Sequence, residues 1–538
     1  MSSNLLKGTA ILTIGLFLSK ALGLLYVIPF YAIVGKESIG LYQYAYIPYN
    51  IALSIAIAGA PLAFSKYVAK YNALGDYATG RKLMKSGMTI MAITGLVSFL
   101  ALYLLAEPIA HLVRENDEQI FSIDEIASVI RWVSFALLVV PMMSLVRGFL
   151  QGYQKMEPTA VSQLIEQIVR IIFVLAGAFI VVNFMHESPR TAVNFAVFAA
   201  FIGALAGLAV LYKYWRGFKP EFDHLLANSP PADDVSFRRM YKELFAYIFP
   251  FILVGVINPL YQFVDMITFN NAMASIGLSK VTDSYFAMLN FLTHKIVMIP
   301  VMVATGFSMA LIPVITDFYA RKNQQGISRS LDQTYQIMLF LTIPMVIGMI
   351  ILSNELYLFL YEQEAMGAEI LASYAPVAVL FGLYTVTAAI LQGIDRHKWI
   401  VFTSLFGLLL KLALNIPLIK LFETNGAILA TGIGYTFAVG LNIAVIAKVL
   451  HYKSKMVFRR LILISLLNVA MFVAVTLTLK GLLVFGPAEG KIQAFLYIVV
   501  CAIVGAVVYG YLSLKTGLAQ KLFGERLTKL TNKLGFRG

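Results

Sequence analysis

Six charged side chains lie inside long apolar stretches of this 538-residue chain. In chain order they are Lys20, Glu166, Arg170, Asp265, Lys295 and Lys411. A charge at the centre of a bilayer costs about 2.5–3.5 kcal/mol even on a lenient insertion scale, so such residues usually face a partner or a wet cavity. Four of the six are cations, and cations so placed favour binding of an anionic group away from bulk water.

The two acids decide how many of these cations are left for an anion. Glu166 and Arg170 are four residues apart on one helix face, and one interpretation is that they neutralise each other inside the protein. Lys20 and Lys295 have no carboxylate within helical reach, which makes them the better substrate-binding candidates. An alternative for Lys20 is that its side chain extends to a membrane interface or pairs with a neighbouring carboxylate. Asp265 is a candidate counter-ion of the lysines or a cation-coupling site.

No motif for covalent chemistry accompanies these charges. The sequence contains no HExxH zinc motif, no cysteine and histidine cluster with metal-ligand spacing, and no GxSxG nucleophile elbow. The nearest approach to a Walker A loop, at 486–492, has the wrong spacing and lacks the terminal Ser or Thr. We therefore expect a protein that is not an enzyme, with no catalytic residue, metal or cofactor.

The elements that must position the charges are membrane helices. The chain is 59% hydrophobic and 13% charged, with a mean hydropathy of +0.80, whereas soluble domains are about 45–50% apolar and about 25% charged. The single cysteine, Cys501, can form no intrachain disulfide. The first apolar stretch, 5–34, is longer than the apolar core of a signal peptide, so we expect it to remain as a helix.

Apolar runs long enough to cross a bilayer predict an all-α integral membrane protein with about fourteen transmembrane helices. The predicted spans are 8–34, 39–65, 86–106, 126–150, 158–184, 191–212, 244–272, 284–316, 333–354, 366–392, 399–421, 425–447, 461–484 and 492–514. The second span contains four tyrosines, which fit an aromatic belt at the membrane interface better than a binding site. They are Tyr42, Tyr44, Tyr46 and Tyr49.

Lysines and arginines gather in alternate loops of this plan. The main clusters lie at 66–85, 213–242 and 448–460. Because basic residues are enriched in cytoplasmic loops, the asymmetry predicts that both termini are cytoplasmic. The sequence pI near 9.5 then reflects membrane topology, and we expect no nucleic acid partner.

Short repeats indicate that the chain is a duplication. The matches are SIGL at 38–41 and 275–278, AKYNALG at 69–75 with ARKNQQG at 320–326, and LQG at 150–152 and 391–393. Their conserved order and similar offsets indicate two copies of a six-helix unit. The 241-residue offset of the LQG pair places Arg170 on Lys411, so each copy has a cation at the same depth of the equivalent helix.

We therefore expect two pseudo-symmetric six-helix lobes followed by two extra helices. The expected domains are an N-terminal lobe at 1–216, a cytoplasmic linker at 217–241, a C-terminal lobe at 242–451, the last two spans at 452–517 and a basic amphipathic cytoplasmic tail at 518–538. Six is an even number, so both lobes insert the same way round. Transporters of that build hold their substrate between the lobes and alternate access by rocking them.

Several motifs in this framework carry a family resemblance. They are Leu6-Lys7-Gly8, Ser19-Lys20-Ala21-Leu22-Gly23, Ala58-Gly59-Ala60, the stretch from Lys295 through Pro300, and Ala310-Leu311-Ile312-Pro313. Together with the helix count they make the chain resemble the multidrug/oligosaccharidyl-lipid/polysaccharide exporter superfamily. Within it the chain is similar to the MurJ-type lipid II flippases, in the YtgP and SpoVB-like branch, over essentially its whole length.

The resemblance implies a transporter of the bacterial cytoplasmic membrane that moves lipid II, the undecaprenyl-diphosphate-linked peptidoglycan precursor, from the inner to the outer leaflet. Lys20 and Lys295 stand where the family places arginines that face a central cationic cavity for the diphosphate, and Arg170 and Lys411 are expected to help them. The expected driving force is the membrane potential or an ion coupled through Asp265 or Glu166. Implied partners are the lipid-linked oligosaccharide and membrane lipids, with cell-wall synthesis or division proteins as further candidates and a monomer as the expected state.

This chain departs from the better-known branch of that family at two places. Tyr26 stands where that branch has a second arginine in the first helix, and Ala52 and Leu53 or their neighbours replace arginines of the second. Three alternatives stay open: a flippase for another polyprenyl-diphosphate oligosaccharide, such as a capsule, teichoic or spore precursor; a cation-coupled multidrug antiporter, in which acids should dominate the spans; and a glycosyltransferase using the same lipid, which would need a catalytic carboxylate pair that is not evident.

Overall fold

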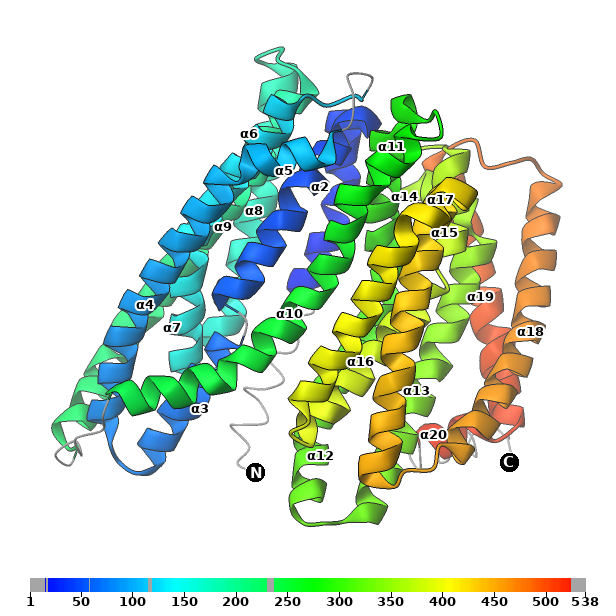
Figure 1. Cartoon of the computed structure of the whole chain (residues 1–538). Coiled ribbons are helices and arrows are strands. Elements are labelled where there is room, and N and C mark those ends of the chain that lie inside the picture. The colour runs from blue at the N-terminus through cyan, green and yellow to red at the C-terminus, as the bar shows by residue number, and fades with distance from the viewer. Residues whose placement is uncertain (1–14, 16–17, 58, 115–118, 230–236, 524–538) are drawn as a thin grey trace. The chain divides into compact units, whose positions relative to one another are not determined.

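The computed structural model describes residues 15, 18–57, 59–114, 119–229 and 237–523. By its contacts the chain forms two compact units, Met1–Ala287 and Met288–Gly538, which we call unit 1 and unit 2. Every regular element in the described part of the chain is a helix (Figure 1). The predicted all-α membrane fold is confirmed.

Twelve stretches of the described chain are long and apolar enough to cross a membrane. Two of them, Leu18–Ala73 and His397–Leu450, have 56 and 54 residues, about twice the length that a bilayer needs. Each contains a backbone break, at Gly35 with φ 73° and at Glu423 with φ 51° and ψ −131°. Each break lies between two of the spans expected from the sequence. The count of fourteen spans and the cytoplasmic placement of both termini stay predictions.

The described residues of unit 1 form a short helix at 18–25 and ten α-helices. These are α2 (Val27–Ile57), α3 (Ala60–Ala73), α4 (Tyr77–Leu104), α5 (Ala106–Val113), α6 (Ile123–Ser134), α7 (Val140–Gly152), α8 (Glu157–Asn183), α9 (Pro189–Ala227), α10 (Phe237–Ala274) and α11 (Thr282–Ala287). Short 3₁₀ turns, Phe135–Leu138 and Ser279–Val281, precede α7 and α11. The motif residues 6–8 and 58 lie outside the described part.

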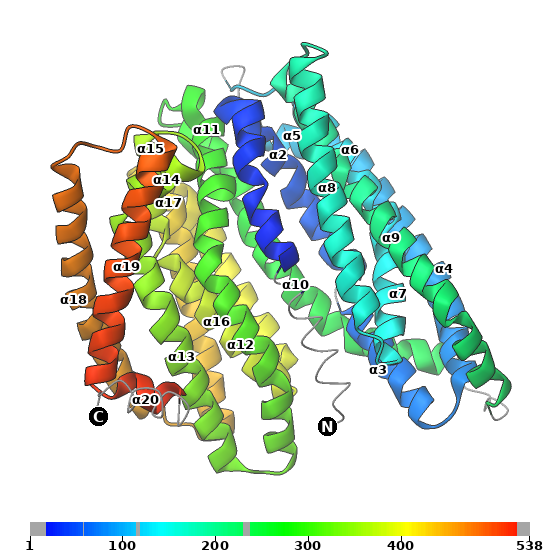
Figure 2. The ribbon, with the colours of Figure 1, turned by 180° about the vertical axis from the view of Figure 1, so that it is seen from behind.

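The helices α8 and α9 lie side by side along most of their length (Figures 1 and 2). Gly203 and Gly207 on α9 have the GxxxG spacing that puts two small residues on one face. A Cβ at Gly203 would lie 2.8 Å from the Glu166 carbonyl oxygen and 3.1 Å from the Arg170 Cβ, and one at Gly207 would lie 3.3 Å from the Glu166 Cβ. These glycines therefore let α9 approach the part of α8 that carries both charges.

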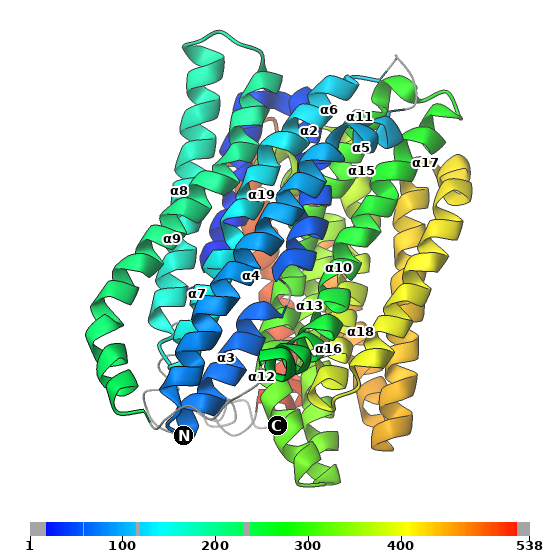
Figure 3. The ribbon, with the colours of Figure 1, turned by 60° about the vertical axis from the view of Figure 1, so that its left-hand side comes forward.

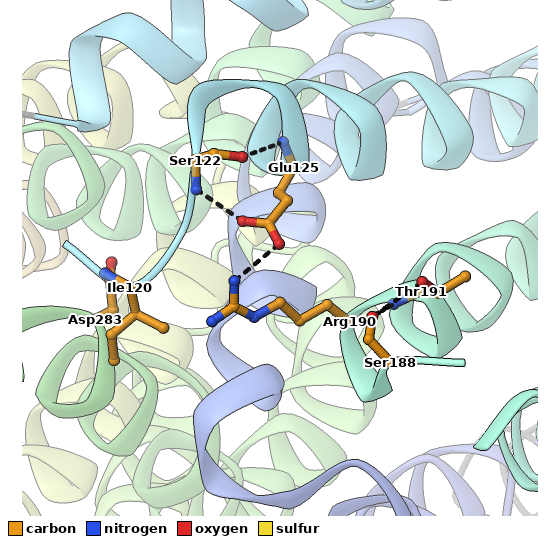
Figure 4. A network of polar contacts seen from close by, with 7 residues as sticks. All are labelled: Ile120, Ser122, Glu125, Ser188, Arg190, Thr191 and Asp283. Carbon is orange, nitrogen blue, oxygen red and sulfur yellow. Dashed lines mark hydrogen bonds and ion pairs between the residues drawn. The ribbon is translucent and has the colours of Figure 1, made fainter. Parts of the chain in front are cut away.

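Side-chain caps and an ion pair fix the ends of α6 and α9 that Figure 4 shows. Ser122 and Glu125 form a capping box, in which the Glu125 amide donates to the Ser122 hydroxyl and the Ser122 amide donates to the Glu125 carboxylate. The other oxygen of Glu125 accepts from Arg190 on α9 at 2.9 Å. Ser188 caps α9 by accepting from the Thr191 amide at 3.2 Å.

A buried carboxylate joins α2, α10 and α11 to the segment before α6. Asp283 accepts from the Tyr44 hydroxyl at 2.6 Å and from the Ile120 amide at 2.8 Å, and Asn270 donates to the Tyr44 hydroxyl at 2.8 Å. The Tyr44 ring also stacks on Phe286, with centroids 4.7 Å apart. This network holds one end of unit 1 together and uses a tyrosine that sequence reasoning assigned elsewhere.

The aromatic-belt interpretation of the second span is wrong. Tyr42, Tyr44 and Tyr49 are buried within unit 1, and Tyr46 stacks on Tyr42 with ring centroids 4.4 Å apart. Alternate tyrosines along a membrane segment do not reveal whether the helix borders lipid or other helices. Here α2 packs against α6, α9 and α10, so its rings serve as core residues.

The predicted linker and lobes need a separate comparison with the structure. Helix α9 continues to Ala227 and α10 begins at Phe237, so helix extends into both ends of the predicted linker 217–241, and residues 230–236 lie outside the described part. The division by contacts falls after Ala287, since α10 and α11 pack on unit 1. The contact division does not test whether the two halves of the sequence arose by duplication. The predicted domain plan therefore stays a prediction.

Unit 2 begins with a π-helical turn and continues with nine α-helices as far as residue 523, where the described chain ends. The turn is Met288–Thr293, and the helices are α12 (His294–Ala320), α13 (Gln324–Ile351), α14 (Ser353–Leu360), α15 (Ala365–Tyr374), α16 (Val377–Gly393), α17 (His397–Leu450), α18 (Lys455–Leu483), α19 (Lys491–Lys515) and α20 (Leu518–Phe523). Figure 3 shows α17 as two antiparallel arms. At their junction a Cβ on Gly426 would clash with the Leu418 carbonyl group, so the turn needs glycine there.

Only the first residues of the predicted basic tail, 518–538, are described. They form α20, in which Leu518 and Leu522 are buried and Lys521 is exposed. Residues 524–538 lie outside the described part. Figure 2 shows α20 beside the ends of α13 and α19.

Candidate functional site

A cavity of about 280 Å³ in unit 1 brings charged side chains of three helices together. Lys20 comes from the helix at 18–25, Arg147 from α7, and Glu166 and Arg170 from α8. Tyr46, Tyr49, Asn50 and Leu53 of α2 complete much of the wall. We call this cavity the unit 1 pocket.

Glu166 bridges two guanidinium groups in this pocket. One carboxylate oxygen accepts from Arg147 Nη2 and the other from Arg170 Nη2, each at 2.9 Å. Arg147, only 9% exposed, also donates through Nε to the Ser162 hydroxyl at 2.9 Å. The predicted pairing of Glu166 with Arg170 is present, but one carboxylate shared by two guanidiniums leaves a net charge of +1.

Lys20 adds a second positive charge to the pocket. Its side chain is exposed and lines the cavity, and no carboxylate of the described part lies within ion-pair distance of it. Its helix lies close to α8, because a Cβ at Gly23 would be 3.2 Å from the Gln167 amide nitrogen. The SK-x-LG motif thus brings the lysine to the network on α8.

Two polar atoms in the pocket wall are buried and have no hydrogen-bond partner in the described part of the chain. They are the Arg170 Nε donor and the Gln163 Oε1 acceptor. A buried polar atom left unpaired costs about 1–3 kcal/mol. The Arg170 donor lies on the side of α9, 3.5 Å from where a Cβ at Gly203 would be, so the suitability of the pocket for an anion depends on its charge.

The departures from the family pattern fall in or near this pocket. Leu53, at a position where the resemblance places an arginine, lines the cavity as an apolar residue. Tyr26 is buried, and its hydroxyl lies 2.9 Å from that of Tyr42. Cations from α7 and α8, Arg147 and Arg170, occupy the same pocket. Arg147 was missed in the sequence analysis because it lies near the end of a predicted span, where an arginine is ordinary.

Lys295 lies in unit 2, directly after a π-helical turn. Such turns occur mostly as local insertions in α-helices, often at functional sites. The ammonium group lies 5.6 Å from the centre of the Phe291 ring, within cation–π range, and the side chain is half-buried. The Tyr361 hydroxyl donates to the Leu292 carbonyl oxygen at 3.0 Å. Tyr361 directly follows α14, so this hydrogen bond ties the π-helical turn to the end of α14.

Lys411, in the first arm of α17, is 1% exposed. Its ammonium group donates to the Thr431 hydroxyl at 2.7 Å, and that hydroxyl in turn donates to the Ala427 carbonyl oxygen at 2.9 Å. The lysine thus joins the two arms of α17 across the break at Glu423. It has no direct access to solvent.

Asp265 is buried on α10 and has interactions with neighbouring groups. It is not among the residues that line the unit 1 pocket. The structure therefore brings together three of the six predicted charges, Lys20, Glu166 and Arg170, in unit 1. Lys295 and Lys411 belong to unit 2.

Two family models match the sequence. The model described as polysaccharide biosynthesis protein matches residues 5–319, more than half of the chain. A model described as MatE matches residues 250–416.

Known proteins resemble the chain over most of its length. It is 44% identical over 533 residues, 98% of each chain, to "Lipid II flippase MurJ" of Bacillus subtilis (strain 168). It is 25% identical to "Stage V sporulation protein B" of the same organism, over 84% of this chain and 85% of that one.

The solved structure "Lipid II flippase MurJ, inward closed conformation" matches 95% of this chain and 99% of its own, with a TM-score of 0.68 and 17% identity. An inward-facing MATE transporter of the MOP superfamily matches with a TM-score of 0.61 and 14% identity, over 82% of this chain and 94% of its own. The chain therefore belongs to the MurJ-type lipid II flippase family, within the MOP superfamily of membrane exporters.

Proposed function

We propose that this protein transfers lipid II from the inner to the outer leaflet of the bacterial cytoplasmic membrane and that the unit 1 pocket receives its diphosphate. The observation that carries the proposal is the charge of that pocket. Lys20, Arg147 and Arg170 surround one carboxylate, so the pocket has a net charge of +2. A family relative 44% identical to this chain is a lipid II flippase by name.

The three cations have different parts in this proposal. Glu166 holds the guanidiniums of Arg147 and Arg170 in place through one oxygen each. A guanidinium is planar and its donors point in fixed directions, so holding the group also orients its remaining donors. Arg147 and Arg170 line the cavity, and Lys20 supplies a point charge. Phosphate oxygens accept charge-assisted hydrogen bonds from both types of cation.

The net charge of the pocket bears on how the cycle is driven. Moving one charge across the membrane is worth about 2.3 kcal/mol per 100 mV. With a negative cytoplasm, an anionic headgroup moves outward downhill, and the emptied pocket, with its positive charge, is drawn back. The membrane potential alone is then sufficient, and ion coupling through Asp265 or Glu166 is the alternative.

The unit 2 lysines enter the proposal in different ways. Lys295 is half-buried and is proposed as a further phosphate contact. Lys411 is enclosed and bonded to Thr431, so its proposed part is to hold the arms of α17 together and add to the local positive potential. This assigns Lys411 a weaker role than its sequence symmetry with Arg170 indicates.

Complementation tests the function. A bacterial strain depleted of its own lipid II flippase should grow when it expresses this chain, and labelled lipid II should become accessible at the outer leaflet. A variant with Lys20→Ala and Arg170→Ala should fail, whereas Lys213→Ala, which removes a cation outside the pocket, should grow as wild type. Growth supported by the double variant would contradict the proposal.

A second candidate has its own support. The match to a polysaccharide biosynthesis family and the relative named for sporulation fit a flippase for another polyprenyl-diphosphate oligosaccharide. The same pocket would serve, because the diphosphate is common to both substrates. Failed complementation, together with transport of another such lipid that depends on Lys20, would favour it.

A further inference from the structure

A second cavity, of about 620 Å³, lies within unit 2 where α13 and α18 begin and α20 ends the described chain. Its volume is in the range of small-molecule sites, about 300–1,000 Å³. No residue of its lining belongs to the unit 1 pocket, and the transport proposal does not use it.

The lining of this cavity is mainly polar and has a net positive charge. Arg329 of α13, Arg460 of α18 and Lys521 of α20 contribute three cations, and Asp332 contributes one carboxylate. The Asp332 carboxylate accepts from the Tyr452 hydroxyl at 2.5 Å. Burial and this bond raise the pKa of Tyr452, so the tyrosine stays protonated and keeps one carboxylate oxygen occupied.

A buried amide marks where an acceptor is missing. Gln336, 1% exposed, lines the cavity, and its Oε1 accepts from the Arg460 guanidinium. Its Nε2 is buried and has no hydrogen-bond partner in the part of the chain that the structure describes. The amide therefore orients the guanidinium with one end and offers an unused donor with the other.

The cavity lies beside the first turns of an apolar helix, the level at which lipid headgroups are expected. It includes Met456 and Arg460, both in the first two turns of the apolar helix α18, which begins at Lys455. Phe458 and Ile462 of the same helix are exposed apolar residues, as expected where a helix borders acyl chains. Basic pockets at this level of a membrane protein bind phosphate headgroups of anionic lipids.

We propose that Arg329, Gln336, Arg460 and Lys521 form a binding site for the phosphate of an anionic membrane lipid, here called the headgroup site. The Arg460 fork, held by Gln336, and the free amide donor of Gln336 bond the phosphate oxygens. Arg329 and Lys521 neutralise its charge from α13 and α20. A bound lipid therefore joins α20 to the start of α13 and α18.

Lipid binding to the full chain in a neutral detergent tests this site. The probes are dioctanoyl phosphatidylglycerol, dioctanoyl phosphatidylcholine and inorganic phosphate, and intact-mass measurement counts the molecules bound. The double variant Arg329→Gln with Lys521→Gln leaves the Gln336 bond intact. Its matched control, Lys453→Gln with Lys455→Gln, removes the same charge from residues that do not line the cavity. A second pair is Arg460→Gln against its exposed neighbour Arg459→Gln.

The expected result is one phosphatidylglycerol bound. Either site variant should weaken its binding about tenfold or more, since cations that face the phosphate are lost. Either control should change the binding no more than about twofold. Phosphatidylcholine should bind far more weakly because its headgroup has no net charge. Inorganic phosphate binding as tightly as the lipid, with the same dependence on the site, would keep the phosphate site but overturn its lipid source. Equal effects of site and control variants would overturn the site itself, whatever the outcome for transport.

Discussion

Arg170 of unit 1 and Lys411 of unit 2 are equivalent by their sequence offset, but the structure gives them opposite surroundings. Arg170 lines a cavity, shares a carboxylate with Arg147 and keeps a donor without a partner in the described part of the chain. Lys411 is enclosed and donates to the Thr431 hydroxyl. The comparison teaches that two cations matched by a sequence offset can differ completely in burial and in hydrogen-bond partners.

The difference has a simple physical basis. A cation that meets a ligand must be held without being fully neutralised, and one carboxylate between two guanidiniums achieves this. A buried lysine such as Lys411 is instead held by hydrogen bonding to a fixed partner, here Thr431, since an unpaired buried charge is very costly. The first arrangement leaves a net positive charge that can bind a ligand, and the second joins the two arms of α17.

The largest expected effect is the loss of stability on removing the Glu166 carboxylate from the unit 1 pocket. Glu166→Ala leaves two guanidiniums without their anion, and breaking such a buried pair costs about 3–5 kcal/mol. We expect a large loss of thermal stability in detergent, measured by the unfolding temperature. The matched control is Glu157→Ala, which removes an exposed carboxylate that accepts a hydrogen bond from Tyr214. Equal stability of the two variants would show that Glu166 does not hold the network together.

The next largest effect is a loss of transport, without a loss of stability, on removing the charge of Lys20. Lys20→Met removes an exposed cation of the pocket, so outer-leaflet accessibility of labelled lipid II should fall about tenfold or more. Its unfolding temperature should stay near that of wild type. The conservative variant Lys20→Arg should recover most of the rate, because it restores the charge. A rate that depends on side-chain size and not on charge would refute the electrostatic role.

A smaller effect is expected where α9 approaches α8. Gly203→Ala forces a Cβ to within 2.8 Å of the Glu166 carbonyl oxygen, and overpacking of this kind costs about 1–3 kcal/mol. Gly217→Ala on the same helix meets nothing within 4 Å and serves as the control. The comparison of unfolding temperatures checks the close approach, and equal values would place the helices farther apart.

The smallest effect on transport is expected for the enclosed lysine of unit 2. Lys411→Met keeps most of the side-chain length and removes the charge. We expect transport per folded molecule to fall less than about threefold, because an enclosed group makes no direct ligand contact. Thr431→Val should behave in the same way. A loss as large as that of Lys20→Met would restore the symmetry that the sequence indicates.

The sequence was sufficient for the parts of this account that depend on local pattern. Apolar length gave the membrane helices, the four-residue spacing gave the bond between Glu166 and Arg170, and the misplaced cation in the first span gave Lys20. It was insufficient where tertiary packing decides. Arg147 reaches Glu166 from another helix, and the burial of Lys411 follows from how the arms of α17 fold back. Neither fact has a one-dimensional signature.

The tyrosines of α2 show the same limit from another side. Their spacing could suit a membrane interface or a helix core, and only the neighbours of α2 decide that Tyr44 bonds Asp283. Similarly, the sequence leaves the alternative roles of Lys20 equivalent, and the cavity beside it supports the binding role. Periodicity predicts which residues share a face, and packing determines what that face meets.

The most direct test of the central claim is the affinity of purified protein for lipid II, measured on wild type, Lys20→Met and Lys411→Met in the same detergent. The account predicts that Lys20→Met weakens binding about tenfold or more, while Lys411→Met stays within about threefold of wild type. Equal affinities for wild type and Lys20→Met, or a larger loss for Lys411→Met, would contradict the assignment of the diphosphate to the unit 1 pocket.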